Sequence, residues 1–215
     1  MNTPRFIRSR LWVEELEPRV VLSTPPSLQD IVPSLIKSVA TASTNWAGYA
    51  AATDLNSPQS YAVNAVRGTW TVPSVIGGWT AFSSMWVGID GFNSSTVQQI
   101  GTESDIIEGQ PQYYAWVQTF PSASFTVTSL TIHPNDSISA SVTYIGDDQF
   151  ALQLTNNTTL ESFSITQAAP GAQRSSAEWV VEAPSAGSRV AVGEIRHRQL
   201  YRCVGHHRAR YGADR

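Results

Sequence analysis

The chain has 215 residues, of which 14% are charged and 10% are aromatic, and its formal net charge is -3. Scarce charges among many aromatic, Ser, Thr and Gly residues argue against a helical bundle and favour one sizeable all-β domain. An acidic chain without a basic stripe is not typical of nucleic-acid binding, and no apolar run reaches the roughly 18 residues that span a membrane.

The charge is unevenly distributed along the chain. Residues 43–188 hold 11 acidic side chains and two basic ones, Arg67 and Arg174, so this segment carries 2 − 11 = −9 near neutral pH. Such a surface approaches neutrality only where carboxylates protonate, near pH ~4. It is either a solubilising surface or the surface of a protein that works in acid. The single cysteine, Cys203, excludes an intrachain disulfide.

Residues 1–42 differ in character from the rest of the chain. The apolar run at 11–13 is too short for the heart of an ordinary signal peptide. Residues 16–23, however, resemble the Leu-Glu-Pro-Arg-type segment at the start of many large surface or exported proteins of planctomycete bacteria. This resemblance implies an exported bacterial protein, either secreted or held at the cell surface. Apolar residues then recur at helical spacing within 24–42, which predicts a short amphipathic helix in a linker.

From Asn45 onward the apolar pattern has the period of two that is typical of strands. Residues 85–91 and 97–101 are predicted to form two strands on either side of a tight turn. Short strands at regular spacing, with turn residues between them, predict an antiparallel β-sandwich. The further predicted strands cover 67–73, 113–120, 125–132, 137–144, 150–154 and 160–166.

Six short blocks, in order over about residues 43–192, resemble the glutamic peptidases, the eqolisin family of acid-acting secreted endopeptidases. The blocks are residues 43–49, 68–73, 86–91, 99–101, 114–116 and 177–182. The resemblance implies a concanavalin-like or jelly-roll sandwich with the active site on a concave face. It also implies a monomer that cleaves peptide or protein substrates without a cofactor or metal, and a propeptide in the region before residue 43.

The family's catalytic pair, a Gln and a Glu, falls on Gln99 and Glu178. The chain has no Gly-x-Ser-x-Gly elbow and no His-Glu-x-x-His zinc motif, which leaves carboxylate chemistry with water as the nucleophile. A Glu178 kept ionised by its neighbours would act first as general base and then as acid. Gln99 would position the water and donate to the oxyanion. Because Gln never ionises, the pair avoids the like-charge conflict of two carboxylates.

Glu182 complicates this assignment, because a residue four positions after Glu178 in a strand points to the same face. The Ala-Glu-Trp block at 177–179 favours Glu178. The resemblance also places two aromatic side chains, Trp86 and Trp116, where they would grip the substrate.

Further acidic residues surround the predicted dyad. The resemblance places Asp90 and Glu103 as hydrogen-bonding supports for Gln99 and Glu178. Two positions depart from the family pattern: Gln118 stands where an acidic residue is common, and Glu103 stands where an Asp is usual. Neither departure changes the dyad itself.

Residues 193–215 are rich in Arg and His and do not continue the strand pattern. Cys203, His206 and His207 suggest a metal site, and the arginines suggest a basic arm. A third interpretation explains more. The codons allowed for residues 195–202, read one nucleotide later, include Phe-Gly-Thr-Val-Asn-Phe-Thr, the type of closing strand that the family has here. We therefore expect a frameshift near Gly193 and a sandwich that lacks its closing strand, with an unpaired edge.

Two alternatives to an active peptidase follow. One is a non-catalytic, lectin-like sandwich that binds carbohydrate through Trp46, Trp70, Trp79 and Trp86. The other is an inactive, frameshifted peptidase remnant. The spatial relation of Gln99 and Glu178 discriminates between a peptidase and a binding module, because only a peptidase needs both polar ends on one face.

Overall fold

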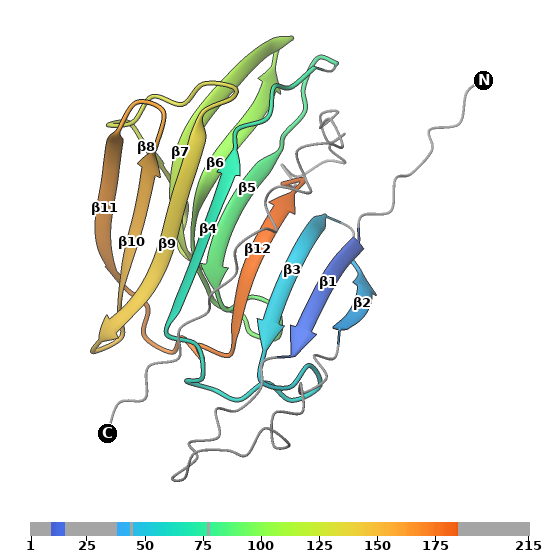
Figure 1. Cartoon of the computed structure of the whole chain (residues 1–215), viewed down its shortest axis with the longest axis vertical. Coiled ribbons are helices and arrows are strands. Elements are labelled where there is room, and N and C mark those ends of the chain that lie inside the picture. The colour runs from blue at the N-terminus through green and yellow to red at the C-terminus, as the bar shows by residue number, and fades with distance from the viewer. Residues whose placement is uncertain (1–9, 16–37, 44, 77, 185–215) are drawn as a thin grey trace, which may run out of the picture.

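The computed structural model describes residues 10–15, 38–43, 45–76 and 78–184, and within these ranges it contains strands and no helix. Two sheets pack face to face (Figure 1), which confirms the predicted β-sandwich. Membrane-spanning helices are accordingly absent from the described ranges.

The larger sheet has eight strands in the order β2-β1-β3-β12-β5-β6-β7-β8. All its pairs are antiparallel except β1–β3, which is parallel. Because β12 lies between β3 and β5, a segment late in the sequence occupies the centre of the sheet. The strand bounds are β1 Arg10–Glu15, β2 Ser38–Ala42, β3 Trp46–Ala52, β5 Ser84–Ile89, β6 Val97–Ile107, β7 Gln110–Phe120, β8 Phe125–Val127 and β12 Ser176–Glu182.

The smaller sheet has four strands in the order β11-β10-β9-β4. It packs on the middle of the larger sheet, because β4 contacts β5 and β12, β9 contacts β5 and β6, and β10 contacts β6. Strands β3, β1 and β2 extend beyond it (Figure 1). Within the described ranges β4 is an end strand. The bounds are β4 Ala65–Thr71, β9 Ser137–Gly146, β10 Gln149–Asn156 and β11 Glu161–Ala168.

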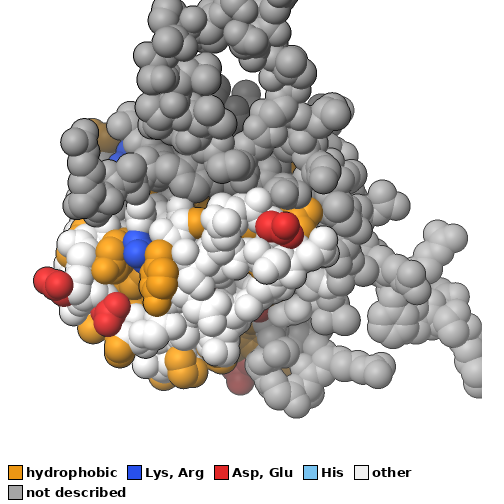
Figure 2. All heavy atoms as spheres, turned by 90° about the horizontal axis from the view of Figure 1, so that it is seen from below, with side chains coloured by type: hydrophobic (Ala, Val, Ile, Leu, Met, Phe, Trp, Pro, Cys, Tyr) orange, Lys and Arg blue, Asp and Glu red, His pale blue; other side chains and the backbone are white. Residues whose placement is uncertain are grey.

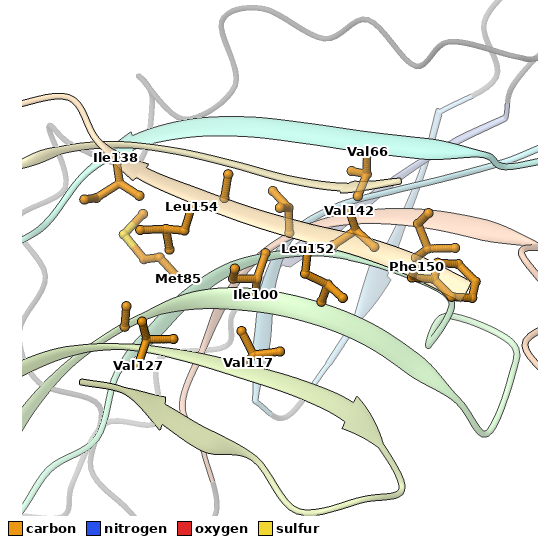
Figure 3. Close-up of a cluster of buried hydrophobic side chains, with 14 of the residues drawn as sticks. Val66, Met85, Ile100, Val117, Val127, Ile138, Val142, Phe150, Leu152 and Leu154 are labelled. Atoms are coloured by element: carbon orange, nitrogen blue, oxygen red, sulfur yellow. The ribbon is translucent and has the colours of Figure 1, made fainter. Parts of the chain in front are cut away.

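The core lies between the two sheets and follows from the alternation of apolar residues along the strands. Figure 3 shows side chains from β9 and β10 meeting those from β5, β6 and β7. Burying each such side chain contributes roughly 1.5–3 kcal/mol. Only every second residue of β5, β6 and β7 points into this core, so the others are presented on the opposite face of the larger sheet. The fully buried members include Ile100, Val117, Ile138, Val142, Phe150, Leu152 and Leu154.

Two expectations about individual elements are wrong. Residues 38–42, expected at the end of a helix, form β2 and pair with β1, because that pairing supplies the backbone hydrogen bonds that five residues at a helix end would lack. The strand expected over 125–132 is limited to Phe125–Val127. Leu130 and Ile132 are buried without belonging to a strand, so their alternation reflects burial and not pairing.

Other expectations fall outside the described residues. These are the Leu-Glu-Pro-Arg-type segment at 16–23, most of the expected helix at 24–42, and the unusual tail at 193–215.

Little positive charge is present on the face shown in Figure 2, where acidic side chains are scattered singly. Of the two basic residues in 43–188, Arg174 lies over aromatic rings, with its guanidinium 3.7 Å from the centroid of Tyr144 and 5.3 Å from that of Tyr61. Such cation–π contacts hold the charge at the protein surface. The described residues that are visible in this view thus form no basic stripe.

Candidate active site

The two residues of the predicted dyad lie in one row across the larger sheet. In the strand register Gly88 of β5 pairs with Glu178 of β12 on one side and with Gln99 of β6 on the other. Gln99 in turn pairs with Gln118 of β7. Directly paired residues of antiparallel strands point to the same face. Glu178, Gln99 and Gln118 therefore share the face opposite the core.

Gly88 lies between the two side chains in this row and has no side chain of its own. A Cβ atom at this position would lie 3.3 Å from Cβ of Gln99 and 3.0 Å from the ring of Trp86. The flanking strands β12 and β6 are two sheet spacings apart, roughly 10 Å. Gly88 places no side chain between Glu178 and Gln99, and the ring of Trp86 packs close beside it.

The amide of Gln99 is held from one side. Its Nε2 donates to Oε1 of Gln118 at 2.8 Å, and Nε2 of Gln118 donates to the carbonyl oxygen of Ser122 at 2.9 Å. Gln99 is only 7% exposed, and its Oε1 is buried without a hydrogen-bond partner among the described residues. This carbonyl oxygen is available to an incoming water molecule.

The carboxyl of Glu178 is fully buried. Its Oε1 accepts a hydrogen bond from the backbone N–H of Phe92 at 3.3 Å. Its Oε2 has no partner of normal geometry within the described ranges, although the Ser176 hydroxyl lies near it. Burial raises the pKa of Glu178 well above its usual value and the charge of Asp90 adds to this, while the Ser176 hydroxyl and the Phe92 N–H oppose it. Burial therefore works against the expected ionisation of Glu178, whereas the Ser176 hydroxyl and the Phe92 N–H favour it.

Asp90 supports the site indirectly. Its Oδ1 accepts from the N–H and the hydroxyl of Ser175 at 2.9 and 3.1 Å, and its Oδ2 accepts from the N–H of Arg174 at 2.9 Å and the hydroxyl of Thr96 at 3.3 Å. The three bonds from Arg174 and Ser175 tie the end of β5 to the segment that enters β12, and the bond from Thr96 holds the turn before β6. They go to neither member of the dyad, so Asp90 positions the strand that carries Glu178.

Glu182 lies on the same face as Glu178, as predicted, but both its oxygens are occupied. Oε2 accepts from Nε1 of Trp86 at 2.9 Å, and Oε1 accepts from Nδ2 of Asn45 at 3.0 Å. Burial raises the pKa of Glu182, while hydrogen bonds from Trp86, Trp46 and Asn45 oppose the rise. A carboxyl with both oxygens engaged is poorly placed to activate a water molecule, which favours Glu178 for that task.

The two predicted aromatic contacts differ in their accessibility. Trp86 is 2% exposed and packs edge-to-face on Trp46, with ring centroids 5.0 Å apart. Trp116 is 7% exposed and donates from Nε1 to the Ser84 hydroxyl at 3.0 Å. Trp116 and Trp46 line the groove described below, whereas Trp86 lies beneath it. The substrate-gripping role expected of Trp86 thus fits Trp46 better.

A second group of carboxyls lies next to the dyad. Burial, and then the charge of Asp105, raises the pKa of Glu103 from 4.5 to about 8. Burial also raises the pKa of Asp105, which accepts from the hydroxyl of Tyr114 at 3.0 Å and from the N–H of Ser83 at 3.2 Å. No hydrogen bond of the described residues joins Glu103 to Gln99 or Glu178. Glu103 and Asp105 are two positions apart on β6, so their side chains point to the same face of the sheet. This spacing is the sequence signal that could have placed Asp105 beside Glu103.

These side chains border a groove of about 600 Å³. Phe120 and Phe125 at one edge are 44% and 39% exposed. Glu178 and Asp90 lie below the groove surface. The described part of the chain has no cluster of three or more His, Cys, Asp or Glu that could hold a metal ion. Of the predicted site residues, Gln99, Glu103, Trp116, Gln118 and Glu182 line the groove.

The four tryptophans of the carbohydrate-binding alternative do not form a common surface. Trp70 is buried in the core between the sheets and donates to the Thr102 hydroxyl at 2.9 Å. Trp46 and Trp86 pack in a separate cluster on the groove face. Trp79 is 72% exposed in the loop before β5. This arrangement removes the basis for the lectin-like interpretation.

A two-sheet β-sandwich is the fold that the sequence blocks implied. The profile of the peptidase A4 family matches residues 44–194, and the chain belongs to this family. Scytalidopepsin B from Scytalidium lignicola is 35% identical over 124 residues, covering 55% of this chain and 46% of the relative. Aspergillopepsin-2 from Aspergillus niger is 29% identical over 164 residues, covering 65% of this chain and 56% of the relative. The chain thus spans about half the length of these relatives.

Solved structures give the same result. The crystal structure of scytalido-glutamic peptidase with a transition state analog inhibitor superposes with a TM-score of 0.56 at 30% identity, covering 69% of this chain and 71% of that one. A member of the eqolisin family in complex with the tripeptide Ala-Ile-His superposes with a TM-score of 0.51 at 28% identity, covering 70% of this chain and 71% of that one. The similarity confirms the fold that the resemblance implied.

Proposed function

We propose that the protein is an endopeptidase that hydrolyses peptide bonds in weak acid, with Gln99 and Glu178 acting on a water nucleophile. The observation that carries this proposal is the placement of both residues beside Gly88, each with one buried oxygen that lacks a partner among the described residues. A water molecule that bridges these two oxygens would be held for attack. The free N–H of Gln99 would stabilise the oxyanion that then develops.

The raised pKa of Glu178 fits the role of general base in weak acid. A base is most effective when its pKa lies near the working pH, because it is then both ionised and able to hold a proton. Glu178 would take a proton from the water and return it to the leaving amine. Since the ionised form is needed for the first step, we expect activity to fall on the acid side as Glu178 becomes protonated.

The test is cleavage of a denatured protein substrate between about pH 3 and 8, a range that brackets the pKa values of free and buried carboxyls. Glu178→Gln and Gln99→Ala are compared with wild type at every pH. We expect each variant to lose at least roughly 10²-fold in kcat, the scale of removing a catalytic donor or base. Activity should be unaffected by a chelator.

Two exposed residues of the smaller sheet provide matched controls. Gln153→Ala and Glu161→Gln make the same chemical changes outside the groove and should leave activity unchanged. If Glu178→Gln retains the wild-type rate, the proposed role of Glu178 is wrong.

The remaining organisation of the chain follows the same proposal. We propose that residues 43–192 form the peptidase domain, that residues 1–42 serve export and act as a propeptide-like segment, and that the protein is an exported monomer that needs no cofactor. The family match ends at residue 194, which supports a change of reading frame near Gly193. Although β1 and β2 belong to the first segment, they pair at the β3 edge, away from the groove.

A further inference from the structure

The side-chain amides of Gln99 and Gln118 form a hydrogen-bonded series that connects the groove to the turn after β7. The carbonyl oxygen of Ser122 accepts from Nε2 of Gln118 at 2.9 Å, and Oε1 of Gln118 accepts from Nε2 of Gln99 at 2.8 Å. The turn that carries Ser122 is fixed by its own backbone bond, from the N–H of Ser122 to the carbonyl oxygen of Thr119 at 2.9 Å. This hydrogen-bonded series therefore begins at the Ser122 carbonyl, a backbone group whose position the fold determines.

The orientation of both amides follows from the chemistry of the Ser122 carbonyl, the first acceptor in this hydrogen-bonded series. A backbone carbonyl can only accept hydrogen bonds, so Gln118 must present its NH₂ group to Ser122. Its carbonyl oxygen must then face Gln99. Gln99 can satisfy that oxygen only with its own NH₂ group, which turns its Oε1 away from β7. The reverse orientation of Gln99 would place two carbonyl oxygens against each other.

The orientation matters for the chemistry of the site. On the side of Gln99 away from β7, the next strand is β5, where Gly88 has no side chain and is paired on its other side with Glu178 of β12. The buried Oε1 of Gln99 has no partner among the described residues. One N–H of the Gln99 amide is used by Gln118, and a primary amide carries a second.

We propose that Gln118 is a positioning residue that fixes which way the Gln99 amide faces, so that its oxygen holds the attacking water and its second N–H meets the oxyanion. This inference rests on the proposed peptidase function. It assigns the two atoms of the Gln99 amide to separate tasks and explains why an amide at position 118 suits them. Gln118 both donates to Ser122 and accepts from Gln99, and it does so in the same way at every pH.

Among the described residues around Gln118, none competes with Gln99 and Ser122 for its hydrogen bonds. The titratable side chains on this face are Glu103 on β6, Tyr114 on β7, and Glu178 and Glu182 on β12, with Asp105 next to Glu103. The hydrogen bonds of Gln118 found within the described ranges go to Gln99 and Ser122. Strand β8 and the turn before it add Ser124, Phe125 and Thr126 to the groove, none of which ionises in this range.

Three substitutions at position 118 separate the possibilities. Gln118→Glu can still accept from Gln99, Gln118→Met can neither donate nor accept, and Gln118→Lys can only donate, which favours the reversed Gln99 amide. We expect Gln118→Glu to keep kcat within a few-fold at about pH 4, where a Glu carboxyl is partly protonated and can still donate to Ser122. We expect Gln118→Met to lose roughly 10-fold and Gln118→Lys roughly 10²-fold or more in kcat, with little change in KM.

The pH profile gives a second readout. Wild type should show no ionisation that arises from position 118, whereas Gln118→Glu should lose activity on the alkaline side as its carboxylate forms, loses its donor to Ser122 and adds charge beside the dyad. Gln153→Glu places the same new charge on the exposed face of β10 and should leave the profile unchanged. Thermal unfolding midpoints of all variants identify any that lose activity by unfolding.

The outcomes distinguish this inference from the proposed function. If wild type is active, Gln99→Ala is inactive, and Gln118→Lys or Gln118→Met keeps the wild-type kcat while folded, the positioning role is overturned and the dyad stands. If Gln118→Glu falls as low as Gln118→Met at about pH 4, an acceptor at position 118 does not fix the Gln99 amide and the positioning role is overturned. If folded wild type shows no cleavage, or Gln99→Ala is fully active, the proposed function itself fails.

Discussion

Two glutamates on one strand show how residue-level contacts decide chemistry. Glu178 and Glu182 point to the same face of β12, and spacing alone gives no reason to prefer either. The difference lies in their partners, because Asn45 and Trp86 occupy both oxygens of Glu182, whereas Glu178 keeps one oxygen without a normal hydrogen bond in the described part of the chain. Asn45 and Trp86 are separated from Glu182 by 137 and 96 residues, so no local pattern could have revealed these contacts.

Gln98, the residue before Gln99, is a buried amide whose contacts predict a cost in stability. Gln98 is fully buried on the core side of β6, and neither polar atom of its amide has a partner within the described residues. An unsatisfied buried amide costs about 1–3 kcal/mol. We predict that Gln98→Met, which keeps the length of the side chain and removes its polar atoms, increases the free energy of unfolding by that amount.

Urea unfolding at fixed pH measures this effect. Gln153→Met on the exposed side of β10 is the control and should change stability little. A Gln98→Met protein that is less stable than wild type would show that the amide makes hydrogen bonds that stabilise the fold.

At the scale of elements, the predicted strands were recovered where alternation coincides with pairing. The stretches predicted at 113–120, 137–144 and 150–154 lie within β7, β9 and β10. Alternation misled at 125–132, because an apolar residue can be covered by a neighbouring sheet without joining it. The sequence could show that Gln99 and Glu178 each lie on a strand. It could not show that β12 inserts between β3 and β5, which is the pairing that brings the two residues to the same glycine.

That pairing makes Gly88 a sensitive position. A Cβ atom there would lie 3.0 Å from the Trp86 ring, 3.2 Å from the carbonyl oxygen of Gln98 and 3.3 Å from Cβ of Gln99. These contacts are tight but can be relieved by small shifts, so we predict that Gly88→Ala folds. Because the added methyl group fills the space between Gln99 and Glu178, we expect kcat to fall roughly 10²-fold, as a small misplacement of reacting groups can cause.

Kinetics and circular dichroism of the variant test this. Gly78→Ala, where an added Cβ meets nothing within 4 Å, is the matched control. A Gly88→Ala protein with wild-type kcat would mean that the space above Gly88 is not where the water is held.

At the scale of the whole molecule, the buried acidic groups predict how stability depends on pH. The pKa values of Glu103, Asp105, Glu178 and Glu182 are all raised in the folded protein, that of Glu103 from 4.5 to about 8. Above pH 4.5 the unfolded chain releases these protons while the folded protein keeps them. We therefore predict that the stability these four groups contribute is fully present at low pH and is lost as the pH rises toward about 8.

Denaturant unfolding at a series of pH values measures this slope. Each proton that only the folded state retains costs about 1.4 kcal/mol per pH unit. We expect Glu103→Gln to flatten the dependence, because it removes one of the groups. A stability that rises between pH 4.5 and 8 would contradict the raised pKa values.

The tail leads to a separate prediction for the whole chain. If residues 193–215 are out of frame, a single-base correction near Gly193 restores the sequence Phe-Gly-Thr-Val-Asn-Phe-Thr. We expect the corrected protein to unfold at a higher temperature and to associate less, because an added strand would cover an edge that pairs with other chains when it is open. The nucleotide sequence is the first check, and a gene in which no single-base change yields this strand would end the proposal.

The position of β5 has a consequence for motion. Every residue of β5 is buried, and the strand is paired on both sides, by β12 and by β6. Backbone amides in such a strand exchange their hydrogens with solvent only when much of the protein opens. We therefore expect the backbone beside Glu178 and Gln99 to exchange its hydrogens slowly, so a substrate of the proposed peptidase would meet side chains whose backbone is already in place and would spend little of its binding energy on ordering them.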